Sequence, residues 1–294
     1  MVDAQRLSEF MEDENILTRI KVENYLLVQL GARPCSLMTL PAELPNGEAM
    51  GSAIDGIVSP KLSLVRGEAD PRRRLSYIRA LKKEMSKAYH DAVEGSNEFK
   101  SHINWIRRLG LRSRKVEVRP TVRELYIFRE RAVEQRLKRL MKERDRLRKR
   151  AYSRPSPQMD RIHFAYPEEF HGAWLREMGA TLGYPSCCVD AYASERESGV
   201  NVEERASRQI EDLEKAGRVD PFAYFVGYFF PCAPDCGAAF ALGRECGERL
   251  RNLHPSLEGV YASMVAENLE RVRRQPEVIA KYRAHAEMGR RGPN

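Results

Sequence analysis

Residues 183–190 read Gly-Tyr-Pro-Ser-Cys-Cys-Val-Asp, and residues 231–236 read Pro-Cys-Ala-Pro-Asp-Cys. Each stretch stands at the start of a predicted helix, near 185–197 and 234–253, and each carries a proline suited to a first helical turn. Free backbone N–H groups and the positive helix end stabilise a thiolate there and lower its pKa. We therefore predict that two helix starts bring together four thiols, those of Cys187, Cys188, Cys232 and Cys236.

The rest of the chain is predicted to be mainly α, with a minor strand element in the N-terminal half. Apolar residues at helical spacing predict further helices over residues 5–30, 71–94, 121–152, 167–182, 202–216 and 256–273, with a break at Pro276. Residues 41–70 contain recurring Gly and Pro, which predict loop with one or two short strands. Residues 115–119 alternate like a strand.

A linker is predicted at residues 153–160, where two prolines and two serines gather. It would separate a mostly helical region, residues 1–152, from a helical cysteine domain, residues 161–288. The last residues, 289–294, are predicted to form a loose tail.

Composition narrows the class of protein. The chain has 294 residues, of which 42% are hydrophobic, enough for a packed core. No apolar run approaches the roughly 18–20 residues that a bilayer span needs. Residues 1–14 carry acids where a signal peptide needs a basic start, so we expect a cytoplasmic protein without a membrane partner. Six cysteines are too sparse for a disulfide scaffold.

Positive charge is concentrated in one window. Residues 101–150 hold 18 Lys and Arg against 6 Asp and Glu, while the whole chain carries +8. Arg offers a planar fork for phosphate and a face for stacking on bases, so the helix predicted over 121–152 is expected to attract RNA or another polyanion. The alternative is a solvated helix with internal ion pairs. The candidate nucleic-acid-binding residues are Arg136, Arg139, Lys142, Arg146 and Lys149.

The same helix has an apolar stripe formed by Val133, Leu137, Leu140 and Leu147. Arg144 is predicted to interrupt this stripe.

Four thiolates suit several chemistries. Cys232 and Cys236 have the spacing of one half of a zinc site. The adjacent pair is predicted to fit one small ion less well, because neighbouring side chains do not readily converge, whereas an iron–sulfur cluster can bind them on different irons. We therefore favour an iron–sulfur cluster over zinc. Thiol exchange between the two groups, or simple packing of small buried side chains, are the other interpretations.

Other residues are weaker candidates. Cys246 would lie about 15 Å from Cys236 along a straight helix, and Cys35 is remote in sequence. His163, His171 and Asp190 could be further ligands or proton donors, although a lone His is more often structural. Aromatic residues near the cysteines could shield a cluster or form ordinary core; they are Tyr184, Tyr224, Phe225, Tyr228, Phe229 and Phe230.

The paired motifs, Gly-Tyr-Pro-x-Cys-Cys-Val at 183–189 and Pro-Cys-x-Pro-x-Cys-x-x-Ala at 231–239, resemble the mainly archaeal domain-of-unknown-function family numbered 483. The resemblance covers about residues 160–275 and implies no reaction. The combination of adjacent cysteines with a second close pair is also similar to non-cobalamin epoxyqueuosine reductases, from which no activity is carried over.

The sequence thus favours an iron–sulfur or metal-binding protein of unknown reaction that acts on RNA. The alternatives are a non-catalytic zinc-stabilised module that binds nucleic acid or protein, and a thiol oxidoreductase. The iron–sulfur protein and the thiol oxidoreductase are compatible with an enzyme, and the zinc-stabilised module is not catalytic, so the sequence leaves open whether the chain is an enzyme.

Overall fold

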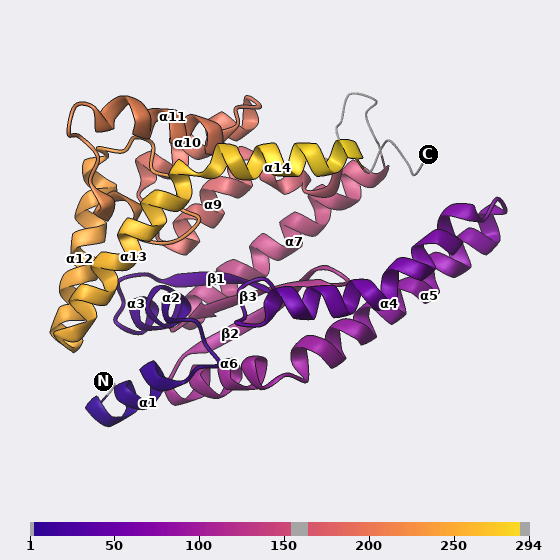
Figure 1. Cartoon of the computed structure of the whole chain (residues 1–294), viewed down its shortest axis with the longest axis horizontal. Coiled ribbons are helices and arrows are strands. Elements are labelled where there is room, and N and C mark those ends of the chain that lie inside the picture. The colour runs from indigo at the N-terminus through magenta and orange to yellow at the C-terminus, as the bar shows by residue number, and fades with distance from the viewer. Residues whose placement is uncertain (1–2, 154–163, 289–294) are drawn as a thin grey trace. The chain divides into compact units, whose positions relative to one another are not determined.

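The computed structural model describes residues 3–153 and 164–288 (Figure 1). The chain separates into two compact units, Met1–Glu130 and Arg131–Asn294. The predicted class is confirmed: the molecule is mainly α, with one small sheet in the N-terminal half.

The sheet of the N-terminal unit has three antiparallel strands in the order β1-β3-β2. They are β1 (Cys35–Leu40), β2 (Arg112–Arg119) and β3 (Val122–Phe128). β3 was predicted as the first turns of a long helix. It is a strand because it pairs with both neighbours, Met38 opposite Leu125 and Lys115 opposite Leu125 on the other side. A two-residue turn, Pro120 and Thr121, closes the hairpin.

Short helices cover this sheet. The single helix expected over residues 5–30 is divided into α1 (Ala4–Glu12), α2 (Thr18–Ile20), η1 (Lys21–Leu26) and α3 (Leu27–Gln29). Asp13 ends α1 and turns its carboxylate to the N–H of Asn15 instead of continuing the helix. The expected stop at Gly31 is confirmed, since this glycine has the left-handed φ of 71° that suits a helix end.

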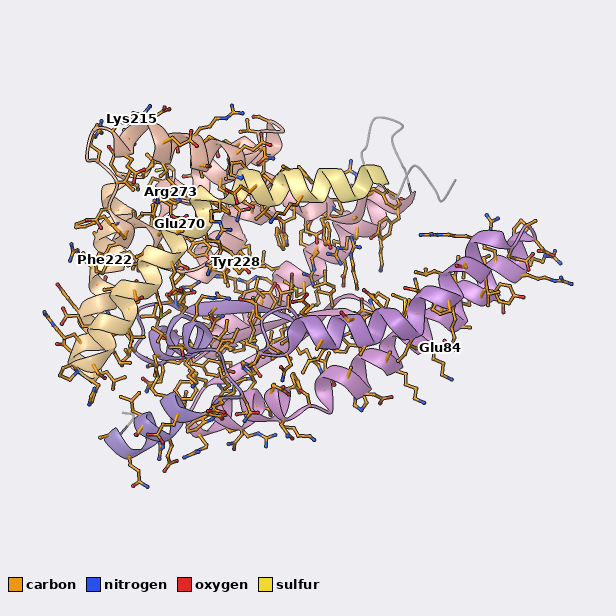
Figure 2. The ribbon with its side chains drawn as sticks, viewed as in Figure 1. Glu84, Lys215, Phe222, Tyr228, Glu270 and Arg273 are labelled. Atoms are coloured by element: carbon orange, nitrogen blue, oxygen red, sulfur yellow. The ribbon has the colours of Figure 1, made fainter. Side chains whose placement is uncertain are left out.

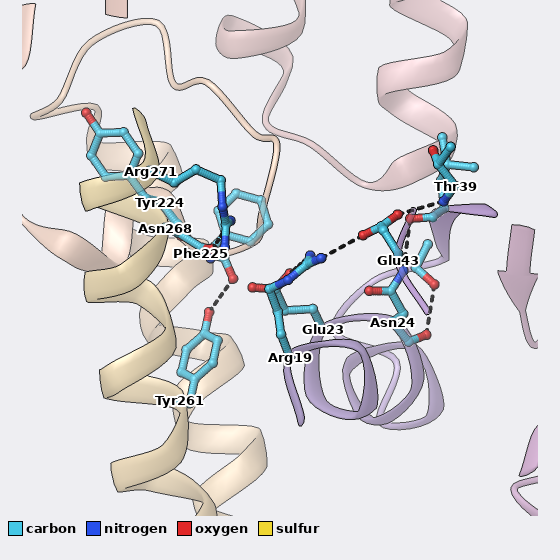
Figure 3. A network of polar contacts seen from close by, with 12 residues as sticks. Arg19, Glu23, Asn24, Thr39, Glu43, Tyr224, Phe225, Tyr261, Asn268 and Arg271 are labelled. Atoms are coloured by element: carbon cyan, nitrogen blue, oxygen red, sulfur yellow. Dashed lines mark hydrogen bonds and ion pairs between the residues drawn. The ribbon is translucent and has the colours of Figure 1, made fainter. Parts of the chain in front are cut away.

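The segment η1 is a π-helix in which every residue is buried. Arg19 pairs with both Glu23 and Glu43 around it, and the carboxylate of Glu43 also accepts the N–H of Thr39 (Figure 3). These contacts tie the wide helical turn to the end of β1. The unit is completed by η2 (His90–Glu94) and α6 (Asn97–Arg108).

A helical hairpin replaces the loop expected over residues 41–70. Helix α4 (Gly47–Gly67) packs against α5 (Pro71–Tyr89), and the hairpin extends away from the sheet of its unit (Figure 1). Ile54 and Val58 are buried on α4, and Leu81 and Ala88 on α5. The glycines and Pro60 of α4 masked this helical spacing in the sequence.

The C-terminal unit contains only helices among its described residues. They are α7 (Arg131–Ser153), η3 (Pro167–Phe170), α9 (Gly172–Leu182), α10 (Ser186–Glu197), α11 (Val202–Glu214), η4 (Pro221–Tyr224), α12 (Gly237–Leu253), α13 (Ser256–Arg273) and α14 (Gln275–Met288). The helices predicted here are present, and the break near Pro276 separates α13 from α14.

The boundary between the units precedes α7, so this helix belongs to the C-terminal unit and not, as predicted, to the N-terminal region. Its buried stripe packs against α9 and η3, and the indole of Trp174 donates to the carbonyl of Leu140 at 3.2 Å. Arg144 does not interrupt the stripe, because it is itself buried, whereas Leu147 is only half-buried. Most of the predicted linker and the predicted tail lie outside the described residues.

Within the described residues, no helix combines the length and the apolar character needed to cross a membrane.

Candidate metal centre

Two helix starts supply the four sulfurs. Cys187 and Cys188 occupy the first turn of α10, and Cys236 is the N-cap of α12, with Cys232 four residues earlier in the preceding loop. The predicted position at a helix start is therefore confirmed for Cys187, Cys188 and Cys236, whereas Cys232 lies in the loop before α12. The predicted convergence also occurs, because all four Sγ atoms lie within 4.8 Å of one another.

Four of the six sulfur separations fall within a narrow range. Sγ of Cys188 lies 3.6 Å from that of Cys236 and 3.8 Å from that of Cys232, while Sγ of Cys187 lies 3.7 Å from that of Cys236 and 3.9 Å from that of Cys188. Four thiolates arranged tetrahedrally around one ion at ~2.3 Å stand about 3.8 Å apart. The four side chains thus have the spacing of ligands to a single ion.

The loop that carries Cys232 is held in place by α11. The guanidinium of Arg205 donates to the carbonyl of Pro231 at 2.9 Å and pairs with Glu195 of α10 at 2.7 Å. Gln209 donates to the carbonyl of Cys232 at 3.5 Å. One arginine therefore links the two segments that carry the cysteines.

Contacts upstream fix the start of the same loop. The hydroxyl of Tyr261 donates to the carbonyl of Phe225 at 3.0 Å, and the amide of Asn268 donates to that of Tyr224 at 3.1 Å (Figure 3). Both donors lie on α13. Hydrogen bonds to α13 thus hold the residues that precede the Cys232 loop.

Most of the aromatic residues noted in the sequence pack beside these segments. The rings of Tyr184, Phe225 and Phe229 contact one another, with centroids 4.6–6.2 Å apart. Tyr224 is also buried, and Phe230 is half-buried. Tyr228 instead leaves 63% of its surface exposed and has a positive φ of 62°, which is rare for a side chain of this size (Figure 2).

The cysteines differ in exposure and in pKa. Cys188 and Cys236 are buried, Cys232 is half-buried and Cys187 is exposed. Burial raises the pKa of Cys188 well above its usual range and that of Cys232 to about 11. Burial acts in the same direction on Cys236, but the N–H of Ala239 and the neighbouring thiols outweigh it, so the pKa of Cys236 is lowered. Of these three thiols, Cys236 is therefore the one that the site favours as a thiolate.

The backbone also contributes to this electrostatic pattern. The N–H of Cys232 points to Sγ of Cys188 at 3.4 Å, a contact that lowers the pKa of Cys188 without overcoming its burial. A cation among the sulfurs would supply the missing stabilisation and favour thiolates at all four positions.

The weaker candidates have other roles or lie elsewhere. Cys35 is buried in β1 of the other unit, where burial raises its pKa to about 12, and Cys246 is buried within α12 outside the group of four. His171 caps α9 by accepting the N–H of Trp174, and Asp190 pairs with Arg176 at 3.1 Å. His163 lies outside the described residues.

The predicted nucleic-acid-binding residues all lie on α7, but they are not equally available. Arg136 pairs with Glu177 of α9, and Arg146 pairs with Glu143 on its own helix. Arg139, Lys142 and Lys149 are exposed. The structure thus leaves part of the predicted surface open and neutralises the rest.

A second basic helix is α5, whose positive charge was not recognised from the sequence. It carries seven Lys and Arg and one acid. The 101–150 charge window lies downstream of it, and the acids that flank it on both sides, Glu68, Asp70, Asp91 and Glu94, dilute its charge in longer windows. A window matched to the predicted helix would have found it.

Comparison with known proteins adds no relative. No protein-family model matches the chain, and neither a curated protein nor a solved structure matches it. The resemblance to family 483 therefore rests on the two cysteine motifs alone, and the function must be argued from the four-cysteine group.

Proposed function

We propose that this protein binds one zinc ion through Cys187, Cys188, Cys232 and Cys236, and that the ion holds the start of α10 against the loop before α12. The observation that carries the proposal is the set of sulfur separations, 3.6–3.9 Å for four of the six pairs. Zinc binds four cysteines in this tetrahedral arrangement in structural sites.

The spacing favours a single ion over the iron–sulfur cluster preferred from the sequence. A cluster distributes its protein ligands over different irons that are separated by bridging sulfides, so their sulfurs stand farther apart. Here each of Cys187, Cys188 and Cys236 has at least two sulfur neighbours within 3.9 Å. These short separations support a single ion over a cluster.

Four protein ligands also favour a structural role. Catalytic zinc sites keep one position for water or substrate, whereas structural sites are closed by four side chains. The two segments that the ion would join are otherwise linked through Arg205 and a few backbone contacts. Zinc would supply the strongest connection between α10 and the loop that leads into α12.

Thiol exchange is the second candidate, favoured by one observation. Cys236, whose pKa is lowered, lies 3.7 Å from the exposed Cys187. In such an exchange an external disulfide is the oxidant. The thiolate of Cys236 attacks it and releases one thiolate, and Cys187 then displaces the second, which leaves a Cys187–Cys236 disulfide and a reduced dithiol.

One experiment separates these functions. The full chain is purified anaerobically, and its zinc, iron and acid-labile sulfide are measured per chain beside the Cys188→Ser and Cys246→Ser variants. Both changes alter a buried cysteine of the C-terminal unit, but only Cys188 belongs to the group of four. We expect one zinc per chain in the wild type and in Cys246→Ser, and little in Cys188→Ser.

Cobalt provides a second readout. Reconstitution of the metal-free chain with Co²⁺ should give the intense visible absorption of tetrahedral cobalt–thiolate coordination in the wild type and not in Cys188→Ser. Matching iron and sulfide would instead establish a cluster. A folded, metal-free chain that forms a reversible disulfide between Cys187 and Cys236 would favour thiol exchange and overturn the zinc proposal.

A further inference from the structure

Helix α5 presents one basic face to solvent in a fixed orientation. Its opposite face is held against α4, where Leu81 and Ala88 of α5 are buried with Ile54 and Val58 of α4. At about 100° per residue, Leu81 and Ala88 lie on one side of the helix axis. Packing of the hairpin thus determines which residues of α5 face outward.

The outward residues form a straight basic stripe, which we define as Arg72, Arg79, Lys83 and Lys87. All four are exposed. Successive members are seven, four and four residues apart, so they fall within about 80° of the helix circumference and span roughly 22 Å of its length. Ser76 is the other exposed residue in this arc. The stripe is therefore a row of four cations in which only Ser76, between Arg72 and Arg79, is uncharged.

These cations lack the acids that would neutralise them. The only acid of α5, Glu84, pairs with Lys61 of α4 (Figure 2). Within the part of the chain that the structure describes, no member of the stripe makes an ion pair. Helix α7 differs, because Arg136, Lys138, Arg146 and Arg148 all pair with glutamates.

The charge is also local to this helix. The N-terminal unit has a net charge of +4, and α5 alone contributes +6, so the remainder of the unit is slightly acidic. A polyanion attracted to this unit is thereby directed to the hairpin.

The small number of apolar residues in the stripe distinguishes between two kinds of polyanion, a membrane surface and a nucleic acid. A helix that lies in a membrane surface needs a broad apolar face beside its basic one. The centre of the stripe holds only Arg, Lys and Ser, while the exposed Leu75 and Tyr77 flank it on opposite sides. Regularly spaced cations without an apolar face instead suit a chain of phosphates, whose contacts with Arg and Lys release counterions.

We propose that the stripe on α5 binds the phosphate backbone of a nucleic acid, independently of base sequence. This inference does not depend on the metal centre, which belongs to the other unit. It assigns an interaction surface to the N-terminal unit, in addition to the exposed part of α7.

The test compares two triple variants of the full chain. The stripe variant is Arg79→Gln, Lys83→Gln and Lys87→Gln, and the matched control is Arg73→Gln, Arg74→Gln and Lys82→Gln. Each removes three charges from exposed positions of the same helix, and glutamine preserves helix propensity. Helix content and metal per chain verify that both variants fold and that the C-terminal unit is unaffected.

Binding is measured by fluorescence anisotropy at several salt concentrations, with a labelled 20-nucleotide RNA and a DNA of the same sequence. The stripe variant should bind both roughly tenfold or more weakly at 100 mM salt, and its slope of log affinity against log salt should fall by about 2–3. The control should lose less than about 1 unit of slope. RNA and DNA should respond alike, because the phosphate backbone is common to both.

Three results would overturn the proposal. Equal losses in the two variants would show that the stripe has no special role. A loss confined to a third variant, Arg139→Gln, Lys142→Gln and Lys149→Gln, would assign binding to α7. Binding to vesicles of phosphatidylserine and phosphatidylcholine, without binding to either oligonucleotide, would identify the surface as a membrane contact.

Discussion

Cys187 and Cys188 show how two neighbouring residues can converge on one site. Adjacent side chains are expected to diverge too far for one small ion, yet the Sγ atoms of these two residues lie only 3.9 Å apart. Both residues belong to the first turn of α10. The four cysteines could be selected from sequence spacing alone. The type of metal could not be chosen in this way, because it depends on the sulfur separations, which the side-chain rotamers set.

His102 provides a second residue with a measurable signature. It is fully buried, and its Nδ1 shares a hydrogen bond of 2.6 Å with the hydroxyl of Tyr25, in a direction set by the tautomer of the ring. Burial lowers the pKa of His102 from 6.5 to about 4, although the nearby carboxylate of Asp13 acts in the opposite direction. The unfolded chain therefore binds a proton at a higher pH than the folded chain does.

Because this folded-state pKa is depressed, the N-terminal unit should lose stability as pH falls from about 6.5 to about 4. The loss should approach roughly 3 kcal/mol, at 1.36 kcal/mol per pKa unit. It can be measured as the free energy of unfolding against pH, followed by the fluorescence of Trp105 in a Trp174→Phe background. His102→Gln should flatten this part of the curve, and an unchanged step would contradict the assignment.

A separate loss should appear at lower pH. Hydrogen bonds from Ser101, Asn15 and Trp105 outweigh the burial of Asp13, and they lower its pKa to about 2. Stability from this carboxylate is complete above about 3.8 and is lost as pH falls towards 2. The two steps should therefore be resolved in the same titration. Asp13→Asn should remove the lower step, and it should leave the upper step at least as large, because it takes away the charge that raises the pKa of His102.

At the scale of the element, prediction succeeded where local signals and packing agree. The helices of the C-terminal unit have regular apolar spacing, and α10 and α12 begin close to their predicted starts. Helix α4 was missed because Gly51, Gly56 and Pro60 lower its helix propensity, which packing against α5 overcomes. Strand β3 was missed because pairing with distant β1 determines it.

The close contact of α12 with η4 predicts a strong effect at one glycine. A Cβ added to Gly243 would stand 2.0 Å from the carbonyl oxygen of Phe222, a backbone atom that cannot move freely. We expect Gly243→Ala to destabilise the C-terminal unit by about 2–3 kcal/mol. It should also weaken metal binding, because α12 positions Cys236.

Gly259 of α13 is the matched control, since nothing lies within 4 Å of a Cβ added there. Gly259→Ala should stabilise the unit by roughly 0.5–1 kcal/mol, the usual gain for replacing a helical glycine. Denaturant titrations of the two variants, followed by Trp174 fluorescence, test both expectations. Equal effects would show that the contact with Phe222 does not limit packing.

Helix α7 contains a second comparison, between two Arg–Glu pairs. Arg148 bonds Glu168 of η3 through Nε at 3.0 and 3.1 Å, and both side chains are largely buried. Arg146 pairs with Glu143 at 3.1 Å on the exposed side of the helix. Glu168→Gln should cost roughly 3 kcal/mol, because it leaves a buried guanidinium without its counter-charge.

Glu143→Gln should change the free energy of unfolding by less than about 0.5 kcal/mol, because solvent screens the exposed pair. Urea unfolding gives the free energy of unfolding of both variants, each of which removes one negative charge. Similar values would mean that the pair at Glu168 is screened as strongly as a surface pair. The sequence indicated internal ion pairing as one interpretation of α7 but could not tell which arginines are buried.

At the scale of the whole molecule, each unit contains one tryptophan, Trp105 in the first and Trp174 in the second. Tryptophan fluorescence can therefore follow the unfolding of each unit in the same chain. The indole of Trp105 donates to Asp13 at 2.7 Å, and that of Trp174 to the carbonyl of Leu140 at 3.2 Å. The predicted linker misplaced the boundary because composition marks a loop but does not show that α7 packs on α9.

This division predicts how metal removal affects the molecule. All four cysteines lie in the C-terminal unit, so a chelator should destabilise that unit and leave the N-terminal unit nearly unchanged. An ion present at about 1,000 times its dissociation constant contributes about 4 kcal/mol, which corresponds to roughly 10 °C for a unit of this size. Thermal unfolding of Trp105→Phe should shift accordingly with chelator, whereas that of Trp174→Phe should not. Equal shifts in both variants would show that the units unfold together, and no shift in either would contradict a structural ion.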